Sequence, residues 1–448
     1  MLSAWGEPAC RAIESASTSP EADGAVVFTT EVPLTPGVEA RLRELGEVDL
    51  LVGIPSYNNA STIGHVVSAI SAGLAKHFPR LRAVCVNSDG GSSDGTPEIV
   101  ARAGILSPSA LLVQHPLSPI NKIITPYHGI PGKGSAFRTI FAIADRLQAK
   151  ACAVVDSDLR SITPAWVELL LGPVADYGFD YVSPMYLRHK YDGTITNSIV
   201  YPLTRALYGQ DIRQPIGGDF GFSGRLARHY LGKPVWDTDV ARFGIDIWMT
   251  TTAIAEQFRV CQAFLGAKIH DAKDPGSDLA GMLVQVVASV FDLMRTYEER
   301  WQGIRATDQV PLFGFPHGVG LEPVHVDVDR MIRIFRQGAR DLREVWEVAL
   351  DPVTLEGVVR AASTDPHDVP DALWVRIIYD FAVSYREGRL ASDPLLRSLF
   401  PLYLGRTASF VLRTLQSGTG EVEAIVSGLA DEYARQKDYL RQRWTGRQ

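Results

Sequence analysis

DLLVGIPSYNN, residues 49–59, is the stretch that decides the fold, because a short apolar run is followed directly by polar residues. An apolar run of this length predicts a buried β-strand. The amphipathic stretch 61–76 then predicts a helix, capped by Asn59 or Ser61. A strand followed at once by an amphipathic helix is typical of a β-α-β unit around a mainly parallel sheet.

The same alternation of apolar and amphipathic stretches continues along the chain. Further strands are predicted at 81–87, 110–115 and 151–155, and further helices at 96–103 and 134–147. In open sheets of this kind, ligands bind at the edge formed by the C-terminal ends of the strands. The predicted fold class is therefore α/β, a Rossmann-like, mainly parallel sheet flanked by helices.

The 448 residues fall into three regions that differ in composition and in hydrophobic pattern. Residues 1–45, rich in Ser, Pro, Glu and Ala, are predicted to be a variable, partly disordered extension. Residues 46–275 carry the strand and helix alternation and are predicted to be the catalytic domain. Residues 276–448 are predicted to be a mostly helical C-terminal region. Its helices are expected at 279–301, 328–349, 371–387, 394–416 and 421–443.

Composition excludes several classes of protein. The net charge is −7 and no basic stripe is present, so a nucleic-acid partner is not expected. No apolar stretch reaches the ~20 residues of a membrane span, and the first 25 residues do not resemble a signal peptide. Cys10, Cys85, Cys152 and Cys261 stand far apart, which favours reduced thiols and a cytoplasmic protein.

The triplet Asp156-Ser157-Asp158 follows the predicted strand at 151–155. Two carboxylates at this spacing, just past a buried strand, can jointly face a divalent ion that bridges a diphosphate. His270, after a second apolar run, is a candidate third ligand. A lone DxD is more often a solvated turn and a lone His more often a packed side chain, so only the combination predicts a metal site.

Two glycine-containing motifs lie near the same edge. PGKG, residues 131–134, opens a predicted helix, where free N–H groups, the helix dipole and Lys133 can hold phosphate. NSDGGSSDGT, residues 87–96, is a turn whose glycines permit close backbone approach to a ligand. Taken alone, the turn is equally compatible with a plain loop, and a lone GKG is more often an ordinary exposed helix start.

Taken in order, these motifs resemble the retaining glycosyltransferases that make glucosylglycerate, mannosylglycerate and glucosyl-3-phosphoglycerate, which share a GT-A fold. The resemblance covers residues 49–295 approximately. It rests on IPSYNN (54–59), SDGGSSDGT (88–96), PGKG (131–134), DSD (156–158), QPIGGDF (214–220), FGIDIW (243–248) and His270. It implies a nucleotide-sugar-binding domain at 46–275, a nucleoside-diphosphate hexose donor, GDP- or UDP-linked, and a Mg²⁺ or Mn²⁺ cofactor.

The resemblance also implies roles for individual residues. The nucleoside would be held by Pro55, Tyr57, Asn59 and Ser88. Lys133 would hold the diphosphate, Asp158 and His270 the metal, and Asp156 the ribose and metal. The sugar and acceptor loop would include Gly217, Gly218 and Asp219. Asp246 would lie beside the reacting centre as a catalytic residue together with Lys133, the alternative for Asp246 being a helix-capping role after Gly244.

The acceptor is predicted from YLRHKYDGTITN, residues 186–197. Arg188 can pair bidentately with a carboxylate, and Thr196 can hydrogen-bond it. With Asp192, this spacing resembles the glycerate-binding loop of mannosylglycerate synthases. Relatives that use phosphoglycerate are expected to carry an Arg two residues before that Thr, where this chain has Thr194. The departure favours D-glycerate, and the alternative is a mobile surface loop with incidental charges.

The resulting prediction is transfer of a hexose, glucose in preference to mannose, to D-glycerate with retention of configuration. One alternative is a glucosyl-3-phosphoglycerate synthase that uses 3-phosphoglycerate. Others are an inverting family 2-like transferase, or a nucleotide-sugar-binding protein or nucleotidyltransferase. The C-terminal helices are expected to support a homodimer.

Overall fold

The computed structural model describes residues 32, 34–103, 121–126, 132–269, 279–316, 318 and 324–446. Residues Glu31–Gln448 form one unit. The predicted strand at 110–115, His270 and most of the predicted N-terminal extension lie outside the described residues. The domain boundaries at 46–275 and 276–448 remain predictions, and β8 in the second range joins the sheet of the first.

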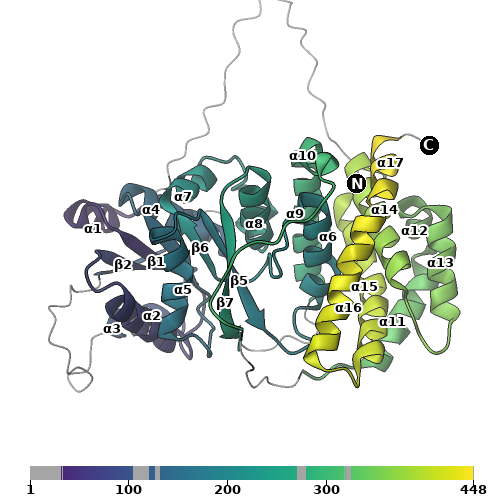
Figure 1. Cartoon of the computed structure of the whole chain (residues 1–448), viewed down its shortest axis with the longest axis horizontal. Coiled ribbons are helices and arrows are strands. Elements are labelled where there is room, and N and C mark those ends of the chain that lie inside the picture. The colour runs from purple at the N-terminus through teal and green to yellow at the C-terminus, as the bar shows by residue number, and fades with distance from the viewer. Residues whose placement is uncertain are drawn as a thin grey trace, which may run out of the picture. The chain divides into compact units, whose positions relative to one another are not determined.

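The part of the chain before the C-terminal helices is predicted to be catalytic and is called the catalytic part below. An eight-stranded sheet lies at its centre, with strand order β3-β2-β1-β4-β6-β5-β7-β8. The strands are β1 Leu50–Ser56, β2 Ala83–Asp89, β3 Asn121–Pro126, β4 Ala151–Val154, β5 Tyr181–Leu187, β6 Phe220–Ser223, β7 Val260–Ala267 and β8 Leu312–Phe313. Neighbouring strands run parallel except where β6 pairs with β4 and β5. This confirms the predicted α/β class with a mainly parallel sheet, which is followed by a helical region (Figure 1).

Both faces of the sheet are covered by helices. One face packs against α2 Ile63–His77, α3 Thr96–Arg102 and α5 Pro164–Ala175. The other packs against α4 Lys133–Arg146, α7 Gly224–Leu231 and α8 Ile245–Ala255, while α1 Pro36–Leu45 lies near β3. Successive strand residues point to opposite faces, so Leu50 and Val52 join one core and Leu51 the other. The predicted apolar runs are buried on both sides for this reason.

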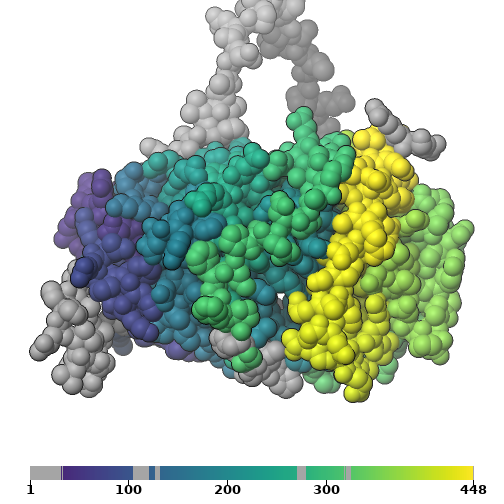
Figure 2. Space-filling model, in the orientation of Figure 1, coloured from purple at the N-terminus to yellow at the C-terminus, as the bar shows by residue number. Residues whose placement is uncertain are grey.

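The C-terminal region is helical, as predicted. Its helices are α9 Ala280–Thr296, α10 Glu298–Gly303, α11 Val328–Asp341, α12 Arg343–Ala349, α13 Pro352–Ser363, α14 Asp371–Glu387, α15 Ser392–Thr414, α16 Thr419–Arg435 and α17 Lys437–Thr445. Helix α16 packs along α6 Tyr201–Tyr208, so the end of the chain contacts the catalytic part directly. In the space-filling view, the yellow C-terminal segment lies against the teal and green segments before it (Figure 2).

Some local predictions are wrong. Helix α2 begins after Thr62, and no side chain caps it. The Asn59 carboxamide oxygen instead accepts hydrogen bonds from the Tyr57 amide at 3.0 Å and the Ser157 hydroxyl at 2.8 Å. The described elements that were not predicted include β3, β5, β6, β8, α1, α5, α6, α7 and α13, and α1 lies within residues 1–45, the predicted variable extension. Three predicted C-terminal helices are each split in two.

Two further observations concern the cysteines and the apolar character of the helices. Cys85, Cys152 and Cys261 are buried free thiols, as expected for reduced cysteines, whereas Cys10 lies outside the described residues. Within the described part of the chain, none of the helices combines the length and the apolar character needed to cross a membrane.

Candidate active site

A cavity of about 810 Å³ lies at the predicted edge of the sheet. It brings together predicted residues from the first strand loop, the start of α4, the end of β4, the loop after β5 and the start of α8. They are Pro55, Tyr57, Asn59, Lys133, Asp156, Asp158, Arg188, Asp192, Thr196, Gly217, Gly218 and Asp246. The predicted donor and acceptor residues therefore share one cavity.

Hydrogen bonds join the two predicted nucleoside loops to each other. The Asn58 amide donates to the Ser92 hydroxyl at 2.8 Å, and the Ser93 amide donates to the Asn58 carboxamide oxygen at 3.0 Å. The Ala60 amide donates to Asp94 at 2.9 Å. Between these contacts the Tyr57 side chain is 63% exposed while lining the cavity. An exposed aromatic ring on a fixed loop can stack on a planar base.

Ser88 is the predicted nucleoside residue that does not reach the cavity. It is fully buried, and its hydroxyl makes no hydrogen bond to any described residue. The neighbouring Asp89 shapes the loop instead, since its carboxylate accepts from the Gly91 amide at 2.9 Å and the Ser92 amide at 2.8 Å. Strand residues alternate in direction, which explains why neighbours in one motif differ in role.

A cluster of two lysines and three aspartates lies at the bottom of the cavity, where all of its members except Asp219 form the polar floor. The Lys133 ammonium lies 2.7 Å from Asp156 Oδ1 and 3.2 Å from Asp246 Oδ1. The Lys268 ammonium lies 2.7 Å from Asp156 Oδ2 and 2.8 Å from Asp219 Oδ2. Each oxygen of Asp156 thus faces a lysine. The sequence prediction omitted Lys268, although a lysine directly after the apolar strand β7 marks the same edge of the sheet.

The cluster shifts the titration of its members. Burial alone raises the pKa of Asp156, but Lys133 and Lys268 outweigh it and hold that pKa well below its usual range. Burial lowers the pKa of Lys133, yet Asp156 and Asp246 raise it above its ordinary value. Burial raises the pKa of Asp246 against the opposing effect of Lys133. Of the two carboxylates that face Lys133, Asp246 therefore has the raised pKa and Asp156 the lowered one.

Two glycines of the predicted motifs are required by close approach. Gly218 has φ +89°, and a Cβ there would lie 2.2 Å from Asp156 Oδ2. Gly134 of the PGKG motif packs on the chain before α8, where a Cβ would lie 2.0 Å from the Val240 carbonyl oxygen. Gly218 lets the backbone pass against the charged floor, and Gly134 lets the start of α4 pack on the chain before α8.

Asp219, predicted as an acceptor residue, lies behind the floor of the cavity. It is fully buried, accepts a hydrogen bond from the Asp156 amide at 2.8 Å and another from the Tyr186 hydroxyl. Together with its pair to Lys268, these contacts hold Asp156 in place. In this structure, Asp219 supports the residues that line the cavity.

Asp246 occupies the first turn of α8, after the N-terminal cap residue Gly244. The hydrogen bond that the Asp246 carboxylate accepts comes from Lys133, and no bond to a described backbone amide is seen, so the capping role named as the alternative is not observed. Its carboxylate faces Lys133 and the cavity. The helix N-terminus favours a negative charge at this position.

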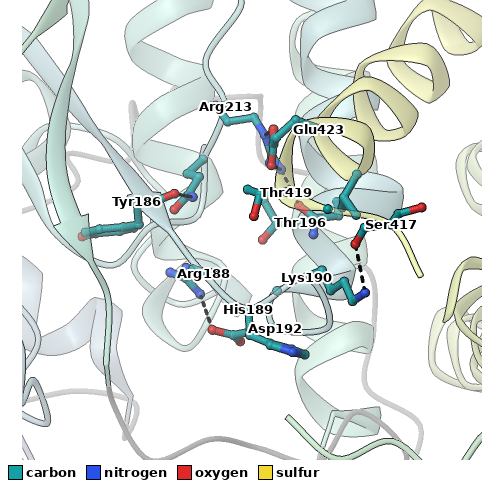
Figure 3. Close-up of a pocket in the computed structure, with 15 residues that line it drawn as sticks. Tyr186, Arg188, His189, Lys190, Asp192, Thr196, Arg213, Ser417, Thr419 and Glu423 are labelled. Carbon is teal, nitrogen blue, oxygen red and sulfur yellow. Dashed lines mark hydrogen bonds and ion pairs between the residues drawn. The ribbon is translucent and has the colours of Figure 1, made fainter. Parts of the chain in front are cut away.

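The loop after β5 holds the predicted acceptor residues (Figure 3). The Arg188 guanidinium lies 3.7 Å from the Asp192 carboxylate and over the Tyr186 ring at 5.3 Å. Thr196 lines the same cavity. Thr194, at the position where the resemblance expects an Arg in phosphoglycerate-using relatives, is buried and shares a hydrogen bond with the Tyr403 hydroxyl of α15.

The residues for a divalent cation are placed only in part. Asp158 and Asp156 both line the cavity, and carboxylates are the ligands that Mg²⁺ and Mn²⁺ prefer. His270 lies outside the described residues. Within the described ranges, no group of three His, Cys, Asp or Glu side chains is placed to hold a metal. The two carboxylates fit such an ion, and the complete ligand set stays a prediction.

Comparison with known proteins gives two curated relatives. A glucosyl-3-phosphoglycerate synthase of Petrotoga mobilis is 25% identical over 285 residues, which are 60% of this chain and 80% of the relative. The chain resembles glucosyl-3-phosphoglycerate synthases. The synthase of Mycolicibacterium smegmatis is 26% identical over 263 residues, or 54% of this chain and 76% of the relative. No protein-family model matches.

Solved structures of a glucosyl-3-phosphoglycerate synthase are also similar. The Mycobacterium tuberculosis enzyme with phosphoglyceric acid is 20% identical with a TM-score of 0.42, over 57% of this chain and 84% of that chain. The same enzyme with Mn²⁺, uridine diphosphate and phosphoglyceric acid has a TM-score of 0.41 over 60% and 84%. Likenesses at this level carry no inference about ligands.

Proposed function

We propose that the chain is a glycosyltransferase that moves a hexose from a nucleoside-diphosphate sugar to a glycerate-type acceptor. The observation that carries this proposal is the shared cavity, which joins Tyr57 and Asn59 to Lys133, Asp156 and Asp158, and these to the loop after β5. A transferase needs both substrates at one reacting centre, whereas a nucleotide-sugar-binding protein needs no acceptor loop. The two curated relatives support the same reading.

The donor side of the reaction is assigned to Lys133 and its neighbours. Cleavage of the anomeric bond leaves negative charge on the diphosphate, and Lys133 at the start of α4 is placed to stabilise it. A bound Mg²⁺ or Mn²⁺ at Asp158 would supply further positive charge to the same oxygens. When the donor binds, Lys133 exchanges part of its pairing with Asp156 and Asp246 for the phosphate.

The acceptor side is assigned to Arg188 and Thr196. Arg188 pairs bidentately with the acceptor carboxylate, and Asp246, across the cavity floor, orients the acceptor hydroxyl. We propose front-face attack with retention, in which a donor phosphate oxygen takes the hydroxyl proton. The new glycosidic bond forms as the bond to the diphosphate breaks.

The acceptor that the relatives favour is 3-phosphoglycerate, since both curated relatives are named for the synthesis of glucosyl-3-phosphoglycerate. D-glycerate is the second candidate, because Thr194 presents no positive charge where a phosphate-binding Arg is expected, and its hydroxyl is bonded to Tyr403. Both acceptors share the carboxylate that Arg188 recognises. Glucose from a uridine donor is the first choice, and GDP-linked glucose or mannose the alternative.

The test is a substrate matrix with purified protein and Mg²⁺ or Mn²⁺. UDP- and GDP-linked glucose and mannose are each combined with 3-phosphoglycerate, D-glycerate or glycerol 3-phosphate, which lacks the carboxylate. Nucleoside diphosphate release should require a carboxylate-bearing acceptor. Turnover with 3-phosphoglycerate alone removes the D-glycerate candidate, and turnover with D-glycerate alone removes the other. No acceptor-dependent release with any pair overturns the proposed function.

A further inference from the structure

The acceptor loop, residues 186–197, lies between the active-site cavity and the turn at residues 415–418 that joins α15 to α16. On the side of that turn, a second cavity of about 240 Å³ separates loop and turn. Arg188, Asp192 and Thr196 line both cavities. The acceptor loop therefore separates the reacting centre from the C-terminal helices.

Lys190 connects the acceptor loop to the end of α15 by hydrogen bonds. Its ammonium donates to the carbonyl oxygens of Thr414 at 2.6 Å, Leu415 at 3.2 Å and Ser417 at 3.2 Å. Carbonyls at the end of a helix carry partial negative charge and lack partners within the helix. A single cation that takes three such oxygens fixes the position of the loop backbone.

Two further loop residues contact the same helix. The Tyr191 hydroxyl donates to the Val411 carbonyl at 3.4 Å, and the Thr194 hydroxyl shares a hydrogen bond with Tyr403. Nearby, Arg213 pairs with Glu423 of α16 at 2.9 Å. These contacts hold the loop against α15 and α16, while Tyr191 and Thr194 also line the active-site cavity.

Arg188 and Asp192 flank Lys190 by two residues on each side and point elsewhere (Figure 3). Their 3.7 Å pair lies at the cavity. Arg188 and Asp192 are each only two residues away from Lys190, and each residue of chain spans at most ~3.5 Å. A shift of the backbone at Lys190 therefore also moves Arg188 and Asp192. A loop left unfastened must also be ordered when the acceptor binds, which weakens affinity.

We propose that Lys190 is a positioning residue for the acceptor, through which the end of α15 sets acceptor affinity. The proposal rests on the proposed function and deepens it. Lys190 acts through Arg188 and Asp192 and leaves the donor half of the cavity unchanged. The C-terminal helical region thereby contributes to substrate recognition, beyond packing against the catalytic part.

The test compares Lys190→Met with Lys190→Arg in steady-state kinetics, using whichever acceptor the wild-type protein turns over. Lys190→Met should raise the acceptor KM by about ten-fold or more, as expected for loss of a charged hydrogen-bond donor. The donor KM should stay within about two-fold. Lys190→Arg should restore most of the acceptor affinity. Tyr403→Phe, which removes the second contact, should raise the acceptor KM in the same direction and serves if Lys190→Met does not fold.

Arg205→Met is the matched control, because Arg205 of α6 pairs with Asp431 of α16 at 2.7 Å across the same interface, away from the acceptor loop. It should leave the acceptor KM unchanged. An equal change of the acceptor KM in Lys190→Met and Arg205→Met would overturn the inference, and so would a fall in kcat of Lys190→Met with an unchanged acceptor KM. Either result would leave Lys190 with a structural role only. If the wild-type protein turns over no acceptor, the proposed function fails and the inference fails with it. If the wild-type protein is active but Lys190→Met has an unchanged acceptor KM, the inference alone fails.

Discussion

The Lys268 ammonium lies 2.8 Å from the Asp219 carboxylate, at a place where the two side chains are 4% and 0% exposed. The same ammonium reaches Asp156 at 2.7 Å and the Gly217 carbonyl oxygen at 2.8 Å. One buried cation thus stands between two carboxylates and a loop backbone. The charge of Asp156 at the cavity floor depends on it.

Replacement of Lys268 by Met should be strongly destabilising. It leaves Asp156 and Asp219 facing each other without their shared cation, and breaking a buried ion pair in this way costs about 3–5 kcal/mol. Urea unfolding measures the loss. Lys150→Met is the control, because Lys150 pairs with Asp49 at a surface where its side chain is 76% exposed. An unfolding free energy that is the same for both variants would contradict the assigned role of Lys268.

Asp246→Asn should lower kcat by about 100-fold while the nucleotide affinity changes little. The amide keeps the shape of the side chain but removes the charge that orients the acceptor and balances Lys133. Steady-state kinetics with both substrates varied gives the answer. Full turnover of Asp246→Asn at saturating substrates would show that the carboxylate takes no part in the reaction.

Tyr57→Ala should weaken nucleotide binding by about ten-fold without loss of stability. The ring is 63% exposed, so its removal deletes a stacking surface for the base and leaves little core packing to lose. Calorimetric titration with uridine or guanosine diphosphate measures the affinity. Tyr177→Ala, at an equally exposed tyrosine that is 62% exposed and outside the cavity lining, should bind nucleotide normally.

Removal of divalent metal should abolish transfer. Chelation is expected to stop nucleoside diphosphate release, and added Mn²⁺ or Mg²⁺ should restore it. Asp158→Asn and His270→Ala should each raise the metal concentration needed for half-maximal activity, as expected for loss of a ligand. Undiminished activity in excess chelator would remove the cation from the proposal.

Asp371→Asn should destabilise the protein in a pH-dependent way. Asp371 pairs at 2.7 Å with Arg406, whose side chain is 2% exposed. Burial raises the pKa of Asp371, but Arg406 and Arg413 outweigh it and lower that pKa. A lowered pKa gives stability above the unfolded value of about 3.9, which is lost as the pH falls through the folded pKa.

The expected loss for Asp371→Asn is therefore about 2 kcal/mol or more at pH 7, shrinking below about pH 4. Urea unfolding at several pH values measures it. Asp393→Asn, in an exposed pair with Arg397, is the control and should change little. A loss for Asp371→Asn that does not vary with pH would exclude the charge as its cause.

The sequence predicted the sheet because it follows from short-range pattern, whereas most of the cavity residues were predicted from the resemblance to a known family. Strands β1, β2 and β4 are apolar runs with polar ends, and parallel strands bring those ends to one edge. Helix α14 was predicted with its observed bounds, since an amphipathic stretch between breaks determines it. Arg188, Asp192 and Thr196 were predicted from the resemblance to a glycerate-binding loop, and they line the cavity, while their roles stay predictions.

What the sequence did not reveal depends on contacts between distant residues. The pairing of Lys268 with Asp156 joins residues 112 apart, and nothing local shows that Ser88 is buried. Strand β3, with the sequence NKIITP, is short and partly polar and ends in a proline, so its hydrophobic pattern is too weak to predict a strand. The partner of Thr194 lies in α15, so its bonded hydroxyl could not be foreseen from the acceptor motif.

The contact between Lys190 and Ser417 joins residues 227 apart, and this separation has a consequence during synthesis of the chain. The described residues that line the donor side lie at positions 55–268, so they leave the ribosome well before residues 403–419 are made. The residues proposed to bind the nucleotide sugar are therefore synthesised before the support that fixes the acceptor loop, and that loop is held in place only when almost the whole chain has been made.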